Sequence, residues 1–80
     1  MNIRLHKVRS VKGDCVLQVS NLLSIIEFKK LYIDKLGSAG EGMTVENMRM
    51  FCLGKELKDD LFLYSYDIAD EMTVQVMIKK

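Results

Sequence analysis

The stretch MFCLGKELKDD, from Met50 to Asp60, joins an apolar run to a tight reversal and a charged turn. The apolar run predicts a β-strand, and the letters LGKEL predict the reversal that ends it. Alternation along the strand turns Met50 and Cys52 to one face and Phe51 and Leu53 to the other. Since only one face can be the core of so small a protein, the sequence predicts that the strand presents a large aromatic side chain to solvent.

The segments on either side of this stretch predict the rest of the architecture. The two ends, MNIRLHKV and MTVQVMIKK, alternate apolar and polar residues as half-buried strands do. CVLQVS predicts a strand that forms a hairpin with the first strand. NLLSIIEFKKLYIDKLG has helical spacing, with Asn21 or Ser24 as the N-cap and Gly37 as the stop. We therefore predict an α+β fold, in which one α-helix packs on a mixed sheet of four to five strands.

The bulk composition predicts a single domain over residues 1–80 and narrows the choice of partners. The net charge is +1, which gives no reason to expect nucleic acid or an anionic membrane. No apolar run has the length of a membrane span, and the N-terminus lacks the apolar core of a signal peptide. Cys15 and Cys52 lie in separate apolar stretches, which favours buried, reduced thiols and a cytoplasmic or nuclear setting.

The residues that catalysis or metal binding would need are not grouped in the sequence. His6 is the one histidine, and its predicted strand face carries neither serine nor cysteine. The acidic residues at 59–60 and 67–71 lie in predicted turns, where they are typical of solvated loop charge. There is no CxxC motif, so a zinc site is not expected. We expect a protein that is not an enzyme and binds no cofactor.

The segment MRMFCLGKELKDDLFLYSYDIADEMTVQVMI is similar to the C-terminal half of ubiquitin. The helix segment SIIEFKKLYIDK and the start MNIRL also fit, so that the resemblance covers essentially the whole chain. The residues that carry the resemblance are Gly54, Lys55, Leu57, Asp59, Leu63, Tyr66 and Ile68 in the C-terminal half, and Ile25, Phe28, Lys29, Tyr32, Asp34 and Lys35 in the helix. The resemblance implies the β-grasp fold of the ubiquitin superfamily. The first hairpin turn and the loop after the helix are longer here, at surface connections where insertions are tolerated.

The resemblance also implies roles for three structural residues. Lys29 falls inside the apolar stripe of the helix, and the resemblance implies that it pairs with Asp59. The alternative is a lysine whose stem packs against the core while its amine reaches water. Tyr66 is implied to bond backbone within its own loop.

The predicted outer face of the sheet answers the question that Phe51 raises. Alternation turns Phe51 and Met77 outward, and the resemblance implies that these two positions form the recognition patch of the family. Val8 or Val11, in the longer first turn, is the candidate third apolar member. A basic rim is predicted around this apolar centre. The other residues predicted on or beside the face are Arg4, His6, Arg49, Lys55, Gln75 and Lys79, with Lys7, Arg9 and Lys12 in the first turn. Isolated apolar residues are common on any surface, but two on one sheet face favour an interface.

We therefore predict a ubiquitin-like domain that is not conjugated and that belongs to a larger protein. Its expected partners are ubiquitin-binding helices, proteasome receptors or ligase components, and we expect it to be a monomer. One alternative is a conjugatable modifier, because the chain ends in VMIKK and a Gly-Gly tail would have to follow it. The other is a scaffold or Ras-binding type of β-grasp module, which pairs through the edge of its sheet.

Overall fold

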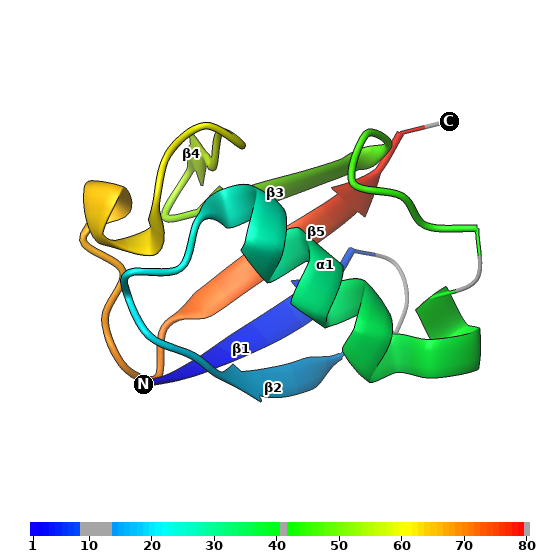
Figure 1. Ribbon diagram of the computed structural model, residues 1–80, viewed down its shortest axis with the longest axis horizontal. Coiled ribbons are helices and arrows are strands. Elements are labelled where there is room, and N and C mark those ends of the chain that lie inside the picture. The colour runs from blue at the N-terminus through cyan, green and yellow to red at the C-terminus, as the bar shows by residue number, and fades with distance from the viewer. Residues whose placement is uncertain (9–13, 41, 80) are drawn as a thin grey trace.

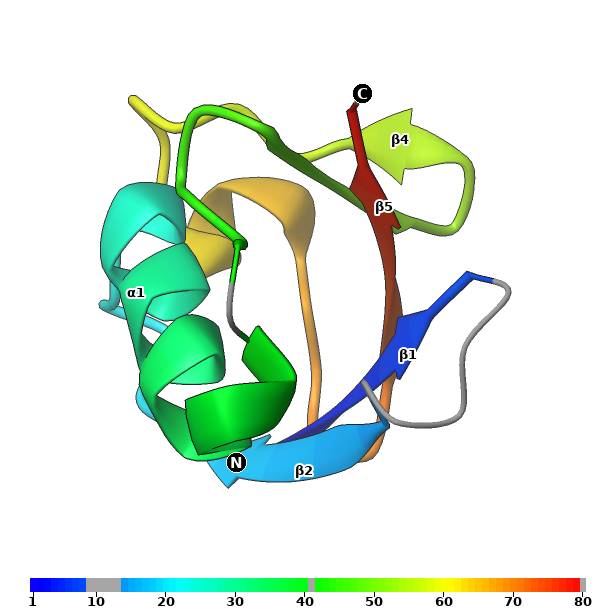
Figure 2. The same ribbon diagram turned by 90° about the vertical axis from the view of Figure 1, so that its right-hand side faces the viewer.

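The computed structural model describes residues 1–8, 14–40 and 42–79. In chain order its elements are β1 (Asn2–Lys7), β2 (Cys15–Gln18), α1 (Ile25–Leu36), the 3-10 turn η2 (Gly37–Gly40), β3 (Met48–Cys52), β4 (Lys55–Glu56), the 3-10 turn η3 (Leu63–Tyr66) and β5 (Thr73–Ile78) (Figure 1). Figure 2 shows two layers, with α1 on one side of the sheet and the opposite side of the sheet uncovered. The predicted α+β class, with one helix on a mixed sheet, is confirmed.

The sheet has five strands in the order β2-β1-β5-β3-β4. The pairing of β1 with β5 is parallel, and the other three pairings are antiparallel. Because β5 lies in the middle, its residue Gln75 is opposite His6 on one side and Phe51 on the other. This register gathers the outward-facing residues of β1, β5 and β3 on one surface.

The helix begins and ends where the capping residues predict. The Ser24 hydroxyl accepts a hydrogen bond of 3.3 Å from the backbone N–H of Glu27, which satisfies one free donor of the first turn. The helix ends at Gly37, whose φ of 56° is a conformation that glycine adopts without strain. Between these ends, Phe28 and Tyr32 are fully buried against the sheet.

The core lies between α1 and the inner face of the sheet. The strands contribute the side chains that alternation turns inward, α1 contributes three, and the connections, η3 included, add four more. Its buried members are Ile3, Leu5, Leu17, Ile25, Phe28, Tyr32, Met43, Met48, Met50, Cys52, Leu57, Leu63, Ile68, Val74 and Val76. Burial of these side chains is the main force that holds helix and sheet together.

The described part of the glycine-rich connection after the helix makes specific contacts. The chain continues from α1 into η2, and Met43 returns to the core with 9% of its surface exposed. Thr44 and Asn47 then close a turn by two reciprocal hydrogen bonds, from each backbone N–H to the other side chain, at 2.8 and 3.1 Å. A buried methionine and a closed turn therefore hold residues 43–47 in place.

Candidate functional site

The outer face of the sheet presents Phe51 and Met77, but they are not direct neighbours. In the antiparallel pairing of β3 with β5, Phe51 is opposite Gln75 and Met77 is opposite Arg49. Phe51 and Met77 therefore occupy a diagonal, still within reach of long side chains. Met77 is 44% exposed, whereas Phe51 is partly buried. The aromatic side chain predicted to face solvent does so only in part.

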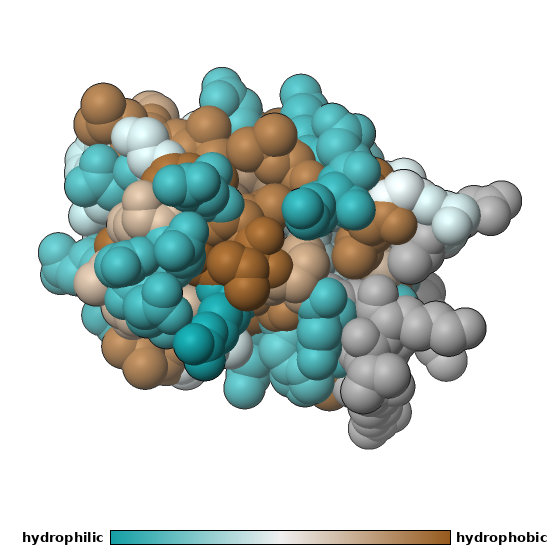
Figure 3. Space-filling model, turned by 90° about the horizontal axis from the view of Figure 1, so that it is seen from below, coloured by the Kyte–Doolittle hydropathy of each residue, from teal (hydrophilic) through white to brown (hydrophobic). Residues whose placement is uncertain are grey.

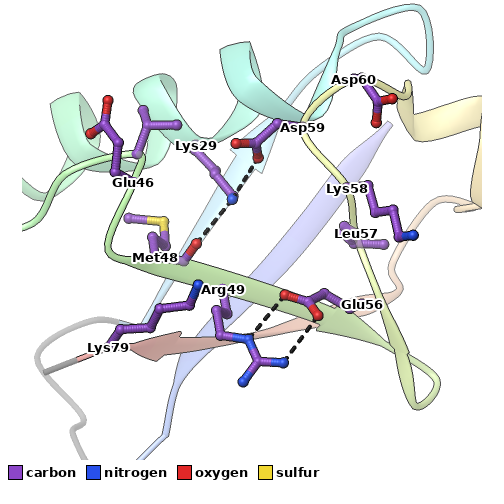
Figure 4. A pocket seen from close by; sticks show the side chains of 11 residues that line it. Lys29, Glu46, Met48, Arg49, Glu56, Leu57, Lys58, Asp59, Asp60 and Lys79 are labelled. Carbon is purple, nitrogen blue, oxygen red and sulfur yellow. Dashed lines mark hydrogen bonds and ion pairs between the residues drawn. The ribbon is translucent and has the colours of Figure 1, made fainter.

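Arg49 covers part of the Phe51 ring. Its guanidinium carbon lies 5.0 Å from the ring centroid, which is the geometry of a cation–π contact. The same guanidinium donates two hydrogen bonds of 3.0 Å to the carboxylate of Glu56 (Figure 4). These hydrogen bonds lower the pKa of the Glu56 carboxyl. Arg49, predicted as a basic-rim cation, therefore has its charge compensated within the chain.

Two other residues of the predicted rim also have an acidic partner. The ring nitrogen Nδ1 of His6 lies 2.8 Å from an oxygen of Asp14, and Arg4 donates to Glu71 at 3.1 Å. Within the described ranges, the exposed residues Lys55 and Lys79 form no ion pair. Among the described residues of this face, Lys55 and Lys79 thus keep their charge without an ion-pair partner, whereas Arg4 and Arg49 are paired.

Leu53 extends the apolar part of this face, although the sequence prediction of the site omitted it. It forms the two-residue reversal between β3 and β4 together with Gly54, and both residues have positive φ, 52° and 80°. Leu53 is 85% exposed. A hollow beside it is lined by Phe51, Leu53, Gly54, Met72, Thr73 and Gln75. Alternation had already placed Leu53 on the Phe51 face, whereas nothing in the sequence pattern indicated Met72.

The first turn is described only in part, so the prediction of a third apolar member, Val8 or Val11, stays a prediction. Val8 is partly buried, and its N–H donates to the carbonyl of Val76 at 2.9 Å, so the start of this turn is bonded to β5. Val11, the alternative third member of the patch, lies outside the described residues, as do Arg9 and Lys12. Lys7 is the last residue of β1 and is partly buried.

The three residues with implied structural roles are all engaged as the resemblance indicates. The Nζ of Lys29 donates to Asp59 at 2.6 Å and to the carbonyl of Met48 at 2.9 Å (Figure 4). Lys29 is only 5% exposed, so its amine is held by these partners. The hydroxyl of Tyr66 accepts a hydrogen bond of 2.8 Å from the backbone N–H of Lys58. These contacts join the helix and η3 to the segment that follows β4.

The second strand forms one edge of the sheet. Val16 is 50% exposed there, and apolar side chains gather near the centre of the face seen from this side, with hydrophilic ones around them (Figure 3). An edge strand also offers unpaired backbone groups to another chain. This edge is the surface that the alternative, edge-pairing type of β-grasp module would use.

The described residues hold no other constellation that points to chemistry. No group of three or more His, Cys, Asp or Glu side chains in them is placed to hold a metal ion. No helix in the ranges 1–8, 14–40 and 42–79 is long and apolar enough to cross a bilayer.

Comparison with known proteins gives the family. A search of curated proteins found no match. The family model described as Ubiquitin family matches residues 7–80, which is nearly the whole chain. That match agrees with the β-grasp architecture and with the paired Lys29 and Asp59. The chain belongs to the ubiquitin family.

Proposed function

We propose that this ubiquitin-like domain is a protein-interaction module, which binds its partner through the outer face of the sheet around Phe51, Leu53 and Met77. The observation that carries the proposal is Leu53, which is 85% exposed in a left-handed conformation. This conformation costs a leucine roughly 1–2 kcal/mol, and an exposed side chain makes no contacts within the domain that would offset that cost. A strained, exposed apolar residue beside a half-buried aromatic is better explained by contact with a partner.

The partner that suits this face is an amphipathic helix. Phe51, Leu53 and Met77 offer an apolar surface on rigid strands and a tight turn, and methionine adapts to different side chains. Lys55 and Lys79 lie free of ion pairs within the described residues and would meet acidic side chains on the flanks of that helix. Ubiquitin-binding helices of proteasome receptors or of ligase components fit this description.

The setting of the domain is part of the same proposal. Recruitment of such helices is a task for a domain within a larger protein in the cytoplasm or nucleus. Cys15 and Cys52 are both free thiols, which supports a reducing compartment.

Amide-shift mapping tests where a partner binds. The labelled domain is titrated with a synthetic helical ubiquitin-binding peptide that has an acidic flank. We expect the largest shifts at residues 49–55 and 73–79, with smaller ones at His6. Shifts confined to β2 would instead support pairing through the sheet edge, and shifts confined to α1 would contradict both modes.

A pair of variants makes the mapping specific. Met77→Ala removes an apolar side chain from the proposed face, and Leu31→Ala removes one of similar exposure, 40% against 44%, from the helix. We expect Met77→Ala to lower the affinity for the peptide and Leu31→Ala to leave that affinity unchanged. Equal effects of the two substitutions would remove the support for this face.

A further inference from the structure

A second exposed apolar surface lies away from the proposed binding face, where the chain enters α1. Four of the nine large hydrophobic side chains that are exposed among the described residues belong to two short segments, and we call this cluster the aromatic pole. Its members are Leu22, Leu61, Phe62 and Tyr64, with exposures of 71%, 38%, 38% and 50%. Figure 2 shows η3, which carries Tyr64, on the α1 side of the sheet, opposite the face of Phe51.

The backbone beneath the aromatic pole is well fixed. The N–H groups of Leu63 and Tyr64 donate to the carbonyls of Leu23 and Asn21, each at 3.0 Å, and Ile25 donates to Leu61 at 2.9 Å. These bonds hold the segment before α1 against the segment that leads into η3, as Figure 1 shows. Leu22 lies between the two residues whose carbonyls accept, so these hydrogen bonds hold its backbone beside Leu63 and Tyr64. The backbone that carries the cluster is therefore held in place by these hydrogen bonds.

The two aromatic rings of the pole form a flat stack. The centroids of Phe62 and Tyr64 are 5.2 Å apart, and the rings are inclined by only 9°. Both rings remain substantially exposed, so the stack keeps aromatic surface open to solvent. Aromatic faces carry negative charge density and attract guanidinium and ammonium groups, most often those of arginine.

The charged side chains within the two paired segments have one sign. Residues 20–27 and 60–67, which contain the paired segments, carry Glu27, Asp60 and Asp67 and no lysine or arginine. All three carboxylates are exposed, and none forms an ion pair within the part of the chain that the structure describes. The nearest cations in sequence come just outside these segments; they are Lys29, whose amine is held by Asp59, and Lys30 and Lys58. The outer face of the sheet has the opposite character, since the described residues Lys55 and Lys79 are exposed there and form no ion pair.

We infer that the aromatic pole is a second docking surface, and that its occupant is a basic peptide segment in which arginine alternates with aliphatic residues. The arginine would stack on the exposed faces of Phe62 and Tyr64 while its charge meets the neighbouring carboxylates. The aliphatic side chains would cover Leu22 and Leu61. The two surfaces of the domain then select partners of opposite charge, an acidic helix on the sheet and a basic segment at the pole.

Two synthetic peptides of ten residues test this inference. Each has three leucines and three serines, and the remaining four positions are arginine in one peptide and glutamate in the other. We expect the arginine peptide to shift the amides of residues 21–24 and 61–67, and the glutamate peptide to leave them unchanged. Tyr64→Ser should raise the dissociation constant of the arginine peptide by at least about threefold, as the loss of an exposed cation–π contact implies.

A second variant keeps the apolar surface and removes the charge. The combination of Glu27→Gln, Asp60→Asn and Asp67→Asn should lower the affinity for the arginine peptide and reduce the dependence of that affinity on salt. Its control combines Asp34→Asn with Glu46→Gln, two exposed acids outside the pole, and should bind as the unchanged protein does.

Several results would overturn the inference. They are equal binding of the two peptides, shifts confined to the sheet face, and undiminished binding by Tyr64→Ser. Shifts at the pole that depend on protein concentration alone would assign the surface to a second copy of the chain, which also contradicts a basic peptide as its occupant.

Discussion

The amine of Lys29 lies 2.6 Å from a carboxylate oxygen of Asp59, and the two residues come from α1 and from the loop after β4. Lys29 is nearly inaccessible, while the side chain of Asp59 is 44% exposed. The carbonyl of Met48 is the second acceptor of the same amine. The buried charge in the apolar stripe of the helix is therefore tolerated because two oxygen atoms accept hydrogen bonds from it. The same contacts join α1 to β3 and to the loop after β4.

Asp59→Ala should destabilise the domain. It removes a charge-assisted hydrogen bond from a buried amine, and such bonds contribute about 1.5–3 kcal/mol. The cost stays below that of a fully buried pair, because Asp59 is partly solvated and Met48 remains as an acceptor. Chemical unfolding measures it, with Asp60→Ala as the matched control, expected within about 0.5 kcal/mol of the unchanged protein. Equal stability of the two variants would contradict the structural role of the pair.

The pair of Arg49 and Glu56 should make stability depend on pH in the acid range. The hydrogen bonds from Arg49 lower the pKa of Glu56 below its ordinary value of 4.5 in the folded state. The pair therefore adds stability above that value and loses it as the pH falls through the lower pKa of the folded state. We expect the advantage of the unchanged protein over Glu56→Gln to shrink as the pH is lowered from 7 to 3 in unfolding experiments. A difference that stays constant over this range would show that the pair does not contribute.

The two thiols should react slowly and at different rates. Cys52 is 5% exposed and Cys15 only partly buried, so the prediction from sequence that both are buried is wrong for Cys15. Burial raises the pKa of both thiols and lowers the thiolate fraction that reacts. With an aromatic disulfide reagent at pH 8, we expect Cys15 to react before Cys52 and both to react much faster in denaturant. Faster labelling of Cys52 in the native protein would contradict its position in the core.

Leu53→Asn should make the domain more stable and a weaker binder. Asparagine followed by glycine suits a two-residue reversal with positive φ at both positions, and relief of the strained leucine should stabilise the fold by about 1 kcal/mol. The same change removes an exposed apolar side chain from the proposed face. Thermal unfolding and peptide titration of one variant measure both effects. An increase in stability with unchanged affinity would show that Leu53 is not retained for binding.

The sequence predicts the fold well because alternation and helical spacing have strict periods. Met50 and Cys52 turn inward and Phe51 turns outward, as the pattern requires, and Ser24 and Gly37 bound the helix. The Lys29 contact followed from a family resemblance, because a charge in an apolar stripe does not by itself say which acid meets it.

The sequence predicts the candidate site less well, because its details depend on contacts between strands. Alternation places Arg49 on the outer face but does not show that Glu56, across the reversal, compensates its charge. The diagonal placement of Phe51 and Met77 depends on the register of β3 with β5, which no local pattern fixes. The aromatic pole was missed because its two segments are far apart in sequence and belong to irregular connections, where hydrophobic residues have no period to reveal a shared surface.

The affinity of the Phe51→Ala variant for a helical ubiquitin-binding peptide with an acidic flank tests the account most directly. Phe51 lies at the centre of the proposed face, beside Gln75, Leu53 and Arg49, and aromatic anchors dominate interfaces of this kind. We predict that calorimetry finds a loss of about 2 kcal/mol or more, which is roughly thirtyfold in the dissociation constant, while the amide spectrum shows a folded domain. An unchanged affinity, or a variant that loses binding only because it unfolds, would contradict the account and assign Phe51 to the core.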